Sequence, residues 1–345
     1  MVQLGEGGVG MGSRIGVGIV GCGFGAYHHG KTLAAEYDDR FKLIGFCDVN
    51  RQRLEQTCSS FNVRGYSDID EMLADRNVEL VIIATRPHTT HFPLAVKSLK
   101  AGRNVVVEKP MCITSGEARE MIKVRDETRR LLTVHQNRRW DMDYLDIRQV
   151  LERGTLGEVR CIRSCYLGGF GEVDCLYDMG SHLIDQILRL AGGLPAKVLG
   201  TLAYPDNEWN RQGFFSAGML YGSGLIAEVS AVPQGESFII PRFYLLGTKG
   251  IIIHDWVQRC EDAMLKHMTF ASADKGIEFD FFRPEYYSSP AWKIPSYYDN
   301  LYDAVNGRGE VAVKPEESME TIIVIEAVIR SAREKCFVDI KRGDR

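Results

Sequence analysis

The chain has 345 residues, more than one hydrophobic core usually contains, so its length predicts two domains. Hydrophobic residues make up 45% and charged residues 26%, as is ordinary for a globular protein. The net charge of −4 does not indicate a basic surface for nucleic acid. The sequence has no run of about 18 apolar residues, so it predicts no membrane span.

The chain begins with a glycine-rich stretch, residues 1–13, which lacks the basic region and apolar core of a secretory signal. We expect this stretch to be a flexible leader. The nine cysteines are an odd number and show neither Cys-x-x-Cys pairs nor zinc spacing. This cysteine usage predicts free thiols in a reducing cytoplasm and no metal site.

The first half of the chain alternates between short apolar runs and helix-like stretches. Strands are expected at residues 14–20, 41–48, 80–85, 104–107 and 131–135. Helices are expected between them, at residues 26–36, 51–61, 90–101 and 115–128. This alternation predicts an α/β domain over residues 14–138, a doubly wound parallel Rossmann sheet with helices on both faces.

The second half of the chain has a different pattern. A helix is expected at residues 144–153, and then strands follow one another at residues 159–167, 197–203, 214–221, 225–232, 238–246 and 250–255. One helix interrupts them near residues 180–190. The pattern predicts an α+β domain over residues 139–345 with a large, mostly antiparallel open sheet. A last helix, residues 317–335, can pack back on the first domain.

The first expected strand leads into Gly-Cys-Gly-Phe-Gly-Ala, which matches the G-x-G-x-x-[G/A] pattern of dinucleotide-binding turns. Glycines there permit a tight turn and let the backbone approach a pyrophosphate at the start of the next helix. The alternative is a generic glycine turn. The strand before and the helix after favour a dinucleotide site, and its candidate residues are Gly21, Gly23, Phe24, Gly25 and Ala26.

Asp48 ends the second expected strand, 27 positions after Gly21. An acidic residue at this place can hold the ribose hydroxyls of NAD, and its charge repels the 2′-phosphate of NADP. Arg51 lies nearby and can accept that phosphate. The sequence therefore favours NAD and leaves NADP open.

Glu108, Lys109 and Pro110 close the apolar run at residues 104–107. Ligands bind at the carboxyl ends of strands in open α/β sheets, so a lysine there can meet a cofactor and a substrate together. The alternative is a surface ion pair before a turn proline.

A second polar cluster follows in the segment from Tyr177 to Asp185. Asp178 and His182 are four residues apart and share one face of an α-helix, and Asp185 and Arg189 extend the same stripe. The apolar residues of the segment lie mostly elsewhere, so His182 belongs to the polar stripe. The alternative is a solvated stripe of ion pairs.

These motifs together resemble the Gfo/Idh/MocA oxidoreductases, and the resemblance covers nearly the whole chain after the leader. It rests on the glycine motif, on Pro87 and His91, on Glu-Lys-Pro, and on the spacing between Asp178 and His182. The segment of residues 135–141 is also similar to the branch that oxidises sugars and inositols, the scyllo-inositol dehydrogenases above all.

The resemblance implies that Lys109, Asp178 and His182 form the catalytic triad. A histidine can take the hydroxyl proton near pH 7, and a lysine ammonium can stabilise the developing alkoxide. Asp178 can orient the substrate or the histidine, and NAD(P) supplies the redox chemistry without a metal.

The resemblance also implies further site residues. It places Pro87 and His88, in the loop after the strand at residues 80–85, beside the cofactor. It also suggests a cis bond at Lys109–Pro110. The cofactor-binding candidates it adds are Thr85, Pro87, His88, Glu108 and Lys109. The substrate-binding candidates are Asn137, Arg138, Tyr166, Asp174 and Trp292.

Three hypotheses for the function remain open. The first is an NAD(P)-dependent dehydrogenase for a secondary hydroxyl of a cyclic polyol, sugar or glycoside, assembled as a homodimer or homotetramer. The second is a glycoside or sugar oxidoreductase that retains and recycles its NAD. The third is a dinucleotide-binding sensor without catalysis, which the joint presence of the lysine, aspartate and histidine disfavours.

Overall fold

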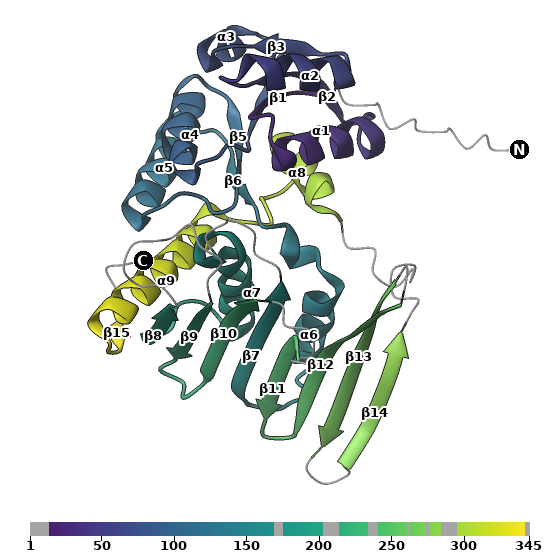
Figure 1. Cartoon of the computed structure of the whole chain (residues 1–345), viewed down its shortest axis with the longest axis vertical. Helices are drawn as coiled ribbons and strands as arrows, with labels where there is room; N and C mark the ends of the chain where they lie inside the picture. The colour runs from purple at the N-terminus through teal and green to yellow at the C-terminus, as the bar shows by residue number, and fades with distance from the viewer. Residues whose placement is uncertain are drawn as a thin grey trace, which may run out of the picture. The chain divides into compact units, whose positions relative to one another are not determined.

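The computed structural model describes residues 14–168, 175–202, 214–233, 241–260, 263–272, 276–283 and 295–341 (Figure 1). For residues 142, 167–168, 232–233, 255–260, 263–272 and 276–283 it describes the backbone alone. The expected leader lies outside these ranges. Packing divides the chain into one unit of residues 1–108, 124–132 and 298–312, and a second of residues 109–123, 133–297 and 313–345. The domain boundary expected near residue 138 stays a prediction.

The first sheet has six strands and the doubly wound order 3-2-1-4-5-6. Across the sheet these strands are β3 (Arg64–Tyr66), β2 (Phe41–Cys47), β1 (Ile15–Val20), β4 (Leu80–Ile83), β5 (Asn104–Glu108) and β6 (Leu132–His135). The pairs of β1 with β2 and β4, of β2 with β3, and of β4 with β5 are all parallel. Every residue of β1 and β4 is buried, as is expected for the central strands of a sheet with helices on both faces. The predicted Rossmann sheet is confirmed.

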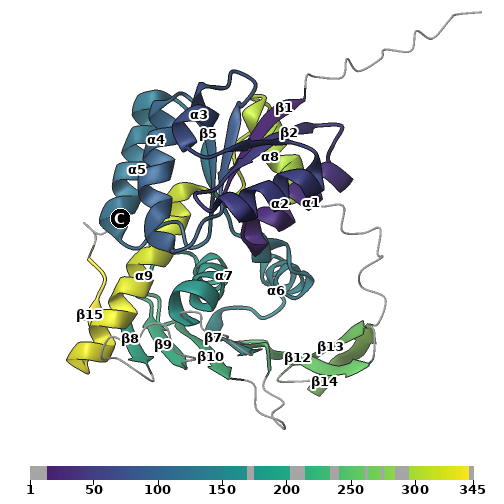
Figure 2. The same ribbon diagram turned by 45° about the horizontal axis from the view of Figure 1, so that its top comes forward.

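Helices lie on both faces of this sheet, with α1 and α2 on one side and α4 on the other (Figure 2). The helical segments of this half of the chain are α1 (Phe24–Glu36), α2 (Arg51–Phe61), α3 (Ile69–Ala74), the 3-10 turn η1 (His88–Thr90), α4 (His91–Lys100) and α5 (Ser115–Thr128). Helix α2 begins where expected because the Asn50 side chain caps it, accepting a hydrogen bond from the Arg53 N–H at 3.0 Å. A later helix, α8 (Tyr297–Val305), was not predicted, and neither were β3 and α3.

The second sheet has nine strands. In order across it they are β14 (Gly276–Arg283), β13 (Ala263–Ser272), β12 (Gly250–Cys260), β11 (Phe243–Gly247), β7 (Val159–Gly168), β10 (Ile226–Pro233), β9 (Phe215–Leu220), β8 (Lys197–Leu202) and β15 (Val338–Asp339). Neighbouring strands of this sheet are antiparallel except β7 and β10, which run parallel. The prediction of a mostly antiparallel sheet is therefore confirmed, although β13, β14 and β15 were not predicted.

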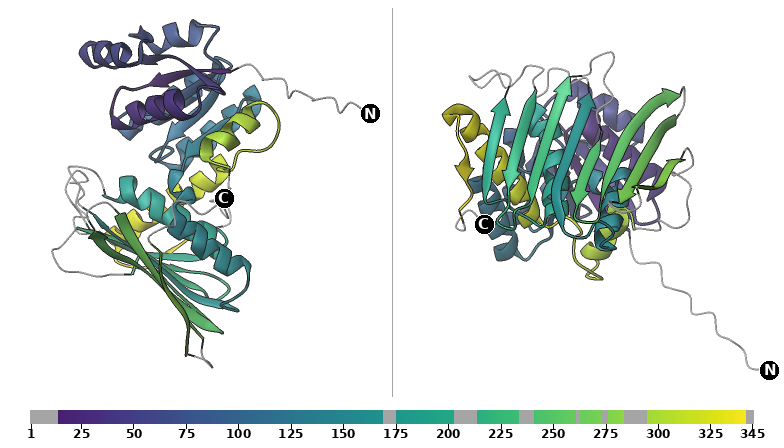
Figure 3. Two further views of the ribbon diagram at one scale, coloured as in Figure 1. Left: turned by 90° about the vertical axis from the view of Figure 1, so that its right-hand side faces the viewer. Right: turned by 90° about the horizontal axis from the view of Figure 1, so that it is seen from below.

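Helices of the second unit cover one face of the nine-stranded sheet. These helices are α6 (Met142–Glu152), α7 (Ser181–Ala191) and α9 (Pro315–Glu334). The short turn η2 (Asn137–Trp140) precedes α6, and the short turn η3 (Leu176–Gly180) precedes α7. Helix α7 packs on β7 and β10, and α9 packs on β8. Within the described ranges, no helix of this unit lies over the opposite face (Figure 3, right). No helix in the part of the chain that the structure describes is long and apolar enough to cross a membrane.

Candidate active site

The glycine loop connects β1 to α1 in the first unit. Gly21 has φ of +107°, and a Cβ placed on it would lie 2.4 Å from the Ala84 carbonyl oxygen. Both the backbone angle and the close approach require glycine at this position. Nothing lies within 4 Å of a Cβ placed on Gly23 or Gly25, so the outer side of the loop is open. The loop leads directly into the N-terminus of α1, as a pyrophosphate site requires.

The other two predicted residues of the loop point in opposite directions. Both residues lie in the first turn of α1, where Ala26 is fully buried and Phe24 is 92% exposed. A small residue at position 26 allows the helix to pack closely on the sheet. The exposed Phe24 ring borders the open side of the loop.

Asp48 lies beside this loop and braces it. Its Oδ2 accepts a hydrogen bond from the Cys22 N–H at 2.8 Å, and its Oδ1 accepts one from the Asn50 N–H at 2.7 Å. The carboxylate thus ties the end of β2 to the glycine loop and remains an acceptor with further lone pairs. This placement is the one expected for an acidic residue that binds ribose hydroxyls.

Two arginines follow Asp48, and the structure separates their roles. The Arg51 side chain is 91% exposed and pairs with Glu55 at 2.9 Å on the surface of α2. The Arg53 guanidinium lies 3.9 Å from Asp48 Oδ1. Arg53, which the sequence reasoning missed, therefore lies beside the carboxylate expected to bind the ribose. Its position two residues into α2 was visible in the sequence, but the direction of its side chain was not.

The loop after β4 is held by its own side chains. The hydroxyls of Thr85 and Thr90 lie 2.6 Å apart, and the Pro87 carbonyl accepts from the Thr90 hydroxyl at 2.7 Å and from its N–H at 3.1 Å. His88 begins the short turn η1. The expected cis bond at Lys109–Pro110 is confirmed, and Arg86–Pro87 is cis as well.

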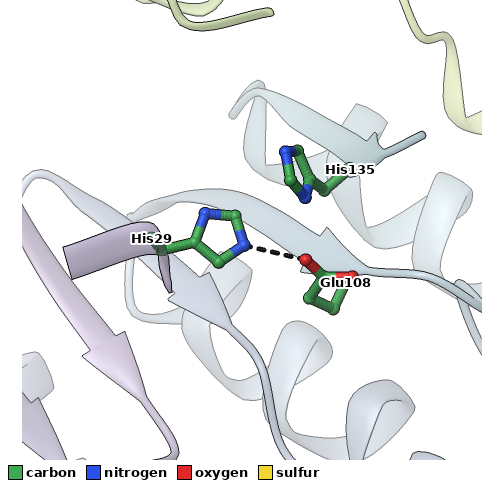
Figure 4. Close-up of side chains that lie close together, drawn as sticks. All are labelled: His29, Glu108 and His135. Atoms are coloured by element: carbon green, nitrogen blue, oxygen red, sulfur yellow. Dashed lines mark hydrogen bonds and ion pairs between the residues drawn. The ribbon is translucent and has the colours of Figure 1, made fainter. Parts of the chain in front are cut away.

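Glu108 ends β5, and its carboxylate faces α1. His29 lies on α1 with its Nε2 2.9 Å from Glu108 Oε1 (Figure 4). The other ring nitrogen of His29 lies 2.7 Å from the Tyr298 hydroxyl, on α8. Sequence reasoning singled out neither His29 nor Tyr298, because the two lie 269 residues apart in the chain.

Lys109 and Asp178 meet in the second unit. The Lys109 ammonium forms an ion pair with the Asp178 carboxylate and also donates to the Asp178 backbone carbonyl at 3.3 Å. The side chains of Lys109 and Asp178 are 16% and 21% exposed, so the pair is sheltered while remaining accessible. His182 follows in the first turn of α7 and is buried.

The segment of the second cluster is not one regular α-helix. Asp178 belongs to η3, a π-helical turn, and α7 begins at Ser181. The expected α-helical spacing of Asp178 and His182 is therefore changed by the wider π turn. Such turns occur often at functional sites, where they redirect a side chain while the helix continues.

The polar stripe of this segment is largely shielded from solvent, with His182 and Asp185 buried and Asp178 and Arg189 half-buried, which disfavours the alternative of a solvated stripe. Asp185 is 1% exposed and accepts two hydrogen bonds from the Arg139 guanidinium, at 2.6 and 2.7 Å. Arg189 pairs with Glu317 at 3.4 Å and also with Glu320. The distal half of the stripe thus fastens α7 to η2 and α9, whereas Asp178 and His182 stand at its start.

The structure describes three of the five predicted substrate residues, and these differ in their exposure and contacts. Asn137 is exposed on η2, and the Arg138 guanidinium lies over the Tyr166 ring, 5.1 Å from its centroid. Arg138 also pairs with Asp141 at 3.1 Å. The two remaining candidates, Asp174 and Trp292, lie outside the described residues.

A buried arginine that the sequence did not single out supports the turn that carries Arg138. Arg242 is fully buried and donates to Gln186 Oε1 at 2.6 Å, and Gln186 Nε2 donates to the Arg138 carbonyl at 2.6 Å. Burial lowers the pKa of Arg242, and Asp143, 3.5 Å from its guanidinium, opposes that shift. Burial and the neighbouring Asp143 raise the pKa of Asp141.

Two family models match the chain. The model described as the NAD-binding Rossmann fold of an oxidoreductase family matches residues 15–136, and the model of the same family's C-terminal alpha/beta domain matches residues 148–340.

Curated relatives extend over almost the same length. The uncharacterised oxidoreductase YdgJ of Escherichia coli is 28% identical, with 94% of this chain and 98% of the relative covered. The scyllo-inositol 2-dehydrogenase (NADP(+)) IolW of Bacillus subtilis is also 28% identical, with 92% and 94% covered.

A solved structure agrees with these matches. An NAD-binding protein from Listeria innocua superposes with a TM-score of 0.81 at 27% identity, over 96% of this chain and 98% of its own. The fold, the glycine loop and both family models lead to one conclusion: the chain belongs to the Gfo/Idh/MocA family of oxidoreductases and carries its NAD-binding Rossmann domain.

Proposed function

We propose that the protein is an NAD(P)-dependent dehydrogenase that acts on a secondary hydroxyl of a cyclic polyol, sugar or glycoside. The observation that carries this proposal is the sheltered ion pair of Lys109 and Asp178 next to the start of α7, where His182 lies. A purely structural ion pair has no need of a buried histidine one helical turn further along the chain.

Each residue of the trio has a distinct task in this proposal. The Lys109 ammonium stabilises the negative charge that develops on the substrate oxygen as its proton leaves. His182 accepts that proton, because an imidazole changes its charge near neutral pH. Asp178 holds the lysine in place through its carboxylate and its backbone carbonyl. The nicotinamide cofactor, when bound, takes up the hydride.

The described residues of the first unit fit a dinucleotide. The open outer side of the glycine loop leaves room for a pyrophosphate at the N-terminus of α1, and Asp48 offers its carboxylate to the ribose. The Asp48 charge favours NAD, whereas Arg53 beside it leaves NADP accessible. The substrate class is supported by relatives named as inositol dehydrogenases, one of which is named for NADP.

The test is a panel of inositols, hexoses and glycosides, each offered with NAD and with NADP, while cofactor reduction is followed by absorbance. The Lys109→Ala variant should lower kcat/KM by roughly 100- to 1,000-fold, because it removes the charge that stabilises the developing alkoxide. Its affinity for the cofactor should remain, as measured by quenching of protein fluorescence.

The control is Lys97→Ala, which removes a lysine that pairs with Asp70 on the surface of the first unit. Full activity of the Lys109→Ala variant would refute the mechanism. Protein that purifies with bound nucleotide and shows little turnover with free NAD would favour an oxidoreductase that retains and recycles its cofactor. Transfer of deuterium from a labelled substrate to the cofactor would exclude a sensor without catalysis.

A further inference from the structure

Three side chains form a hydrogen-bonded chain inside the first unit. The Tyr298 hydroxyl lies 2.7 Å from His29 Nδ1. On the other side of the ring, His29 Nε2 lies 2.9 Å from Glu108 Oε1 (Figure 4). The three residues come from α8, α1 and the end of β5. The proposed mechanism gives no task to His29 or Tyr298, although Glu108 directly precedes Lys109.

The direction of these hydrogen bonds follows from the ionised form of the Glu108 carboxylate. An ionised carboxylate only accepts hydrogen bonds, so His29 Nε2 carries the hydrogen that it shares with Glu108. In the neutral imidazole the other nitrogen is then an acceptor, and the Tyr298 hydroxyl donates to it. Tyr298 thus fixes the tautomer in which His29 can hold Glu108.

The surroundings make this chain rigid. His29 is fully buried, and Tyr298 is 7% exposed. The Tyr298 ring stands edge-on to the His29 ring at 6.2 Å and packs against Tyr37 at 5.2 Å and Phe41 at 6.4 Å. Buried polar side chains keep their places when their hydrogen bonds are satisfied, so this packing confines Glu108 to one position.

Confining Glu108 has a consequence for the next residue. Glu108 is the last residue of β5 and is bonded directly to Lys109. Holding the Glu108 side chain therefore limits the freedom of the backbone from which the Lys109 side chain extends. The Lys109 ammonium is then held by Asp178 at its other end. Lys109 is thus held at two points, through the backbone at Glu108 and through its ammonium at Asp178.

We propose that His29 is a positioning residue for Lys109, acting through Glu108, and that Tyr298 supports it. This inference rests on the proposed role of Lys109 in hydride transfer. Its direct physical consequence, a fixed position of the Lys109 amine, is measurable without any activity.

The test uses two amide substitutions at position 29 that differ in which nitrogen of the histidine they replace. The amide of His29→Gln reaches the place of Nε2 and keeps the contact with Glu108. The amide of His29→Asn reaches only the place of Nδ1, so it keeps the contact with Tyr298 and loses Glu108. We expect His29→Asn to lower kcat by up to about 100-fold, as misplacement of a reacting group does, while KM stays nearly unchanged.

His29→Gln should restore most of that loss, within about 10-fold of the wild type. The deuterium isotope effect on kcat should increase in the asparagine variant, because hydride transfer then limits the rate. Tyr298→Phe should lower kcat by about 2- to 10-fold, which is the usual worth of one hydrogen bond. Tyr302→Phe is the matched control. It removes a hydroxyl from the same helix that takes no part in the hydrogen bonds of His29, so kcat and the isotope effect should stay unchanged.

The second readout is competitive acylation of amines at limiting reagent, followed by mass spectrometry of the peptide that contains Lys109. In the asparagine variant the reactivity of Lys109 relative to exposed Lys31 should rise several-fold, and in the glutamine variant it should stay near the wild-type value. If the wild-type protein oxidises no substrate but Lys109 reactivity follows this pattern, the proposed function fails and the positioning role stands.

Equal Lys109 reactivity in the wild type and both folded variants would overturn the positioning role. So would a loss of kcat that is the same for asparagine and glutamine and leaves the isotope effect unchanged. If His29→Asn does not fold, as judged by circular dichroism, Tyr298→Phe against Tyr302→Phe carries the test. Unchanged kcat and unchanged Lys109 reactivity in Tyr298→Phe would then refute the positioning role of Tyr298, His29 and Glu108.

Discussion

At the scale of single residues, we expect Asp48 and the arginine beside it to decide which dinucleotide is preferred. The Asp48 carboxylate accepts from two backbone N–H groups and lies 3.9 Å from the Arg53 guanidinium. Asp48→Asn removes the negative charge but keeps one acceptor oxygen. We expect it to raise the ratio of kcat/KM for NADP over NAD by about 10-fold, the usual worth of a charged hydrogen bond.

Arg53→Gln should shift the same ratio toward NAD, because it removes the cation beside the ribose site. Arg51→Gln is the control, since Arg51 is exposed and pairs with Glu55. Steady-state rates with both cofactors, at saturating substrate, measure the ratio for all three variants. An effect of Arg51→Gln larger than that of Arg53→Gln would restore the assignment made from the sequence.

What the sequence predicts at this scale depends on how local the information is. Lys109 and Asp178 stand in short motifs with characteristic neighbours, and the structure joins them in an ion pair. The choice between Arg51 and Arg53 depends on side-chain direction within one helical turn, which spacing alone does not fix. His29 and Tyr298 come together only through the packing of distant segments, so no local sequence pattern predicts their contact.

At the scale of elements, the ion pairs beneath α7 hold the helix that carries His182. Asp185 accepts two hydrogen bonds from Arg139, and both side chains are at least nine-tenths buried. Asp185→Asn leaves the Arg139 charge with less compensation in a buried place. We expect it to cost about 3 to 5 kcal/mol of the free energy of unfolding, measured by urea denaturation.

Glu228→Gln is the control for this loss. Glu228 pairs with Arg163 at 2.7 Å on β7 and β10, but both side chains are exposed by more than two-fifths. A surface pair of this kind contributes at most about 1 kcal/mol. Similar losses for the two substitutions would show that burial does not set the strength of the Asp185 pair.

The strand β2 makes the first unit sensitive to alkali. Burial, with smaller effects of nearby acidic groups, raises the pKa of Cys47 from 9.0 to about 12. The folded protein therefore holds this proton more tightly than the unfolded chain. The resulting stability is complete below pH 9 and is lost as the pH rises toward 12.

Between pH 8 and pH 10 the free energy of unfolding should therefore fall by about 1 kcal/mol through Cys47 alone. Cys47→Ala should remove that part of the pH dependence, whatever its own effect at pH 8. Urea denaturation at the two pH values measures the difference, and Cys336→Ala, at an exposed cysteine, is the control. An unchanged fall in the Cys47 variant would contradict the prediction.

The elements themselves were predicted where hydrophobic periodicity is strong. Helices α2 and α5 begin and end at the expected residues, because caps and apolar spacing are local features. The three-residue strand β3 and the six-residue helix α3 were missed, since each is too short for a periodic signal. Their place in the fold follows from pairing of β3 with β2, which is a tertiary contact.

At the scale of the whole molecule, the nine-stranded sheet has one face under helices and one face without them in the described part of the second unit (Figure 3). Alternation along the strands places buried side chains on the first face. The second face carries the exposed apolar residues Leu199, Ile226 and Leu246, on β8, β10 and β11. The sequence predicted these three strands, but it did not reveal which strands would be neighbours or that one face would carry exposed apolar residues.

We expect this second face to be covered by another copy of the chain. Exposed apolar side chains on neighbouring strands of a broad sheet are typical of an interface between protein chains. Light scattering coupled to size-exclusion chromatography should give a mass of two or four chains. Replacing Leu199, Ile226 and Leu246 together by lysine should shift that mass toward one chain, because three charges cannot be buried unpaired.

Lysines introduced at Gln56 and Ser59, exposed on α2 in the first unit, serve as the control for added charge. They should leave the mass unchanged. Circular dichroism and thermal unfolding of the triple variant separate loss of assembly from loss of folding. A wild-type mass equal to one chain would contradict the prediction, and so would a triple variant that folds and keeps the wild-type mass, since the interface would then lie elsewhere.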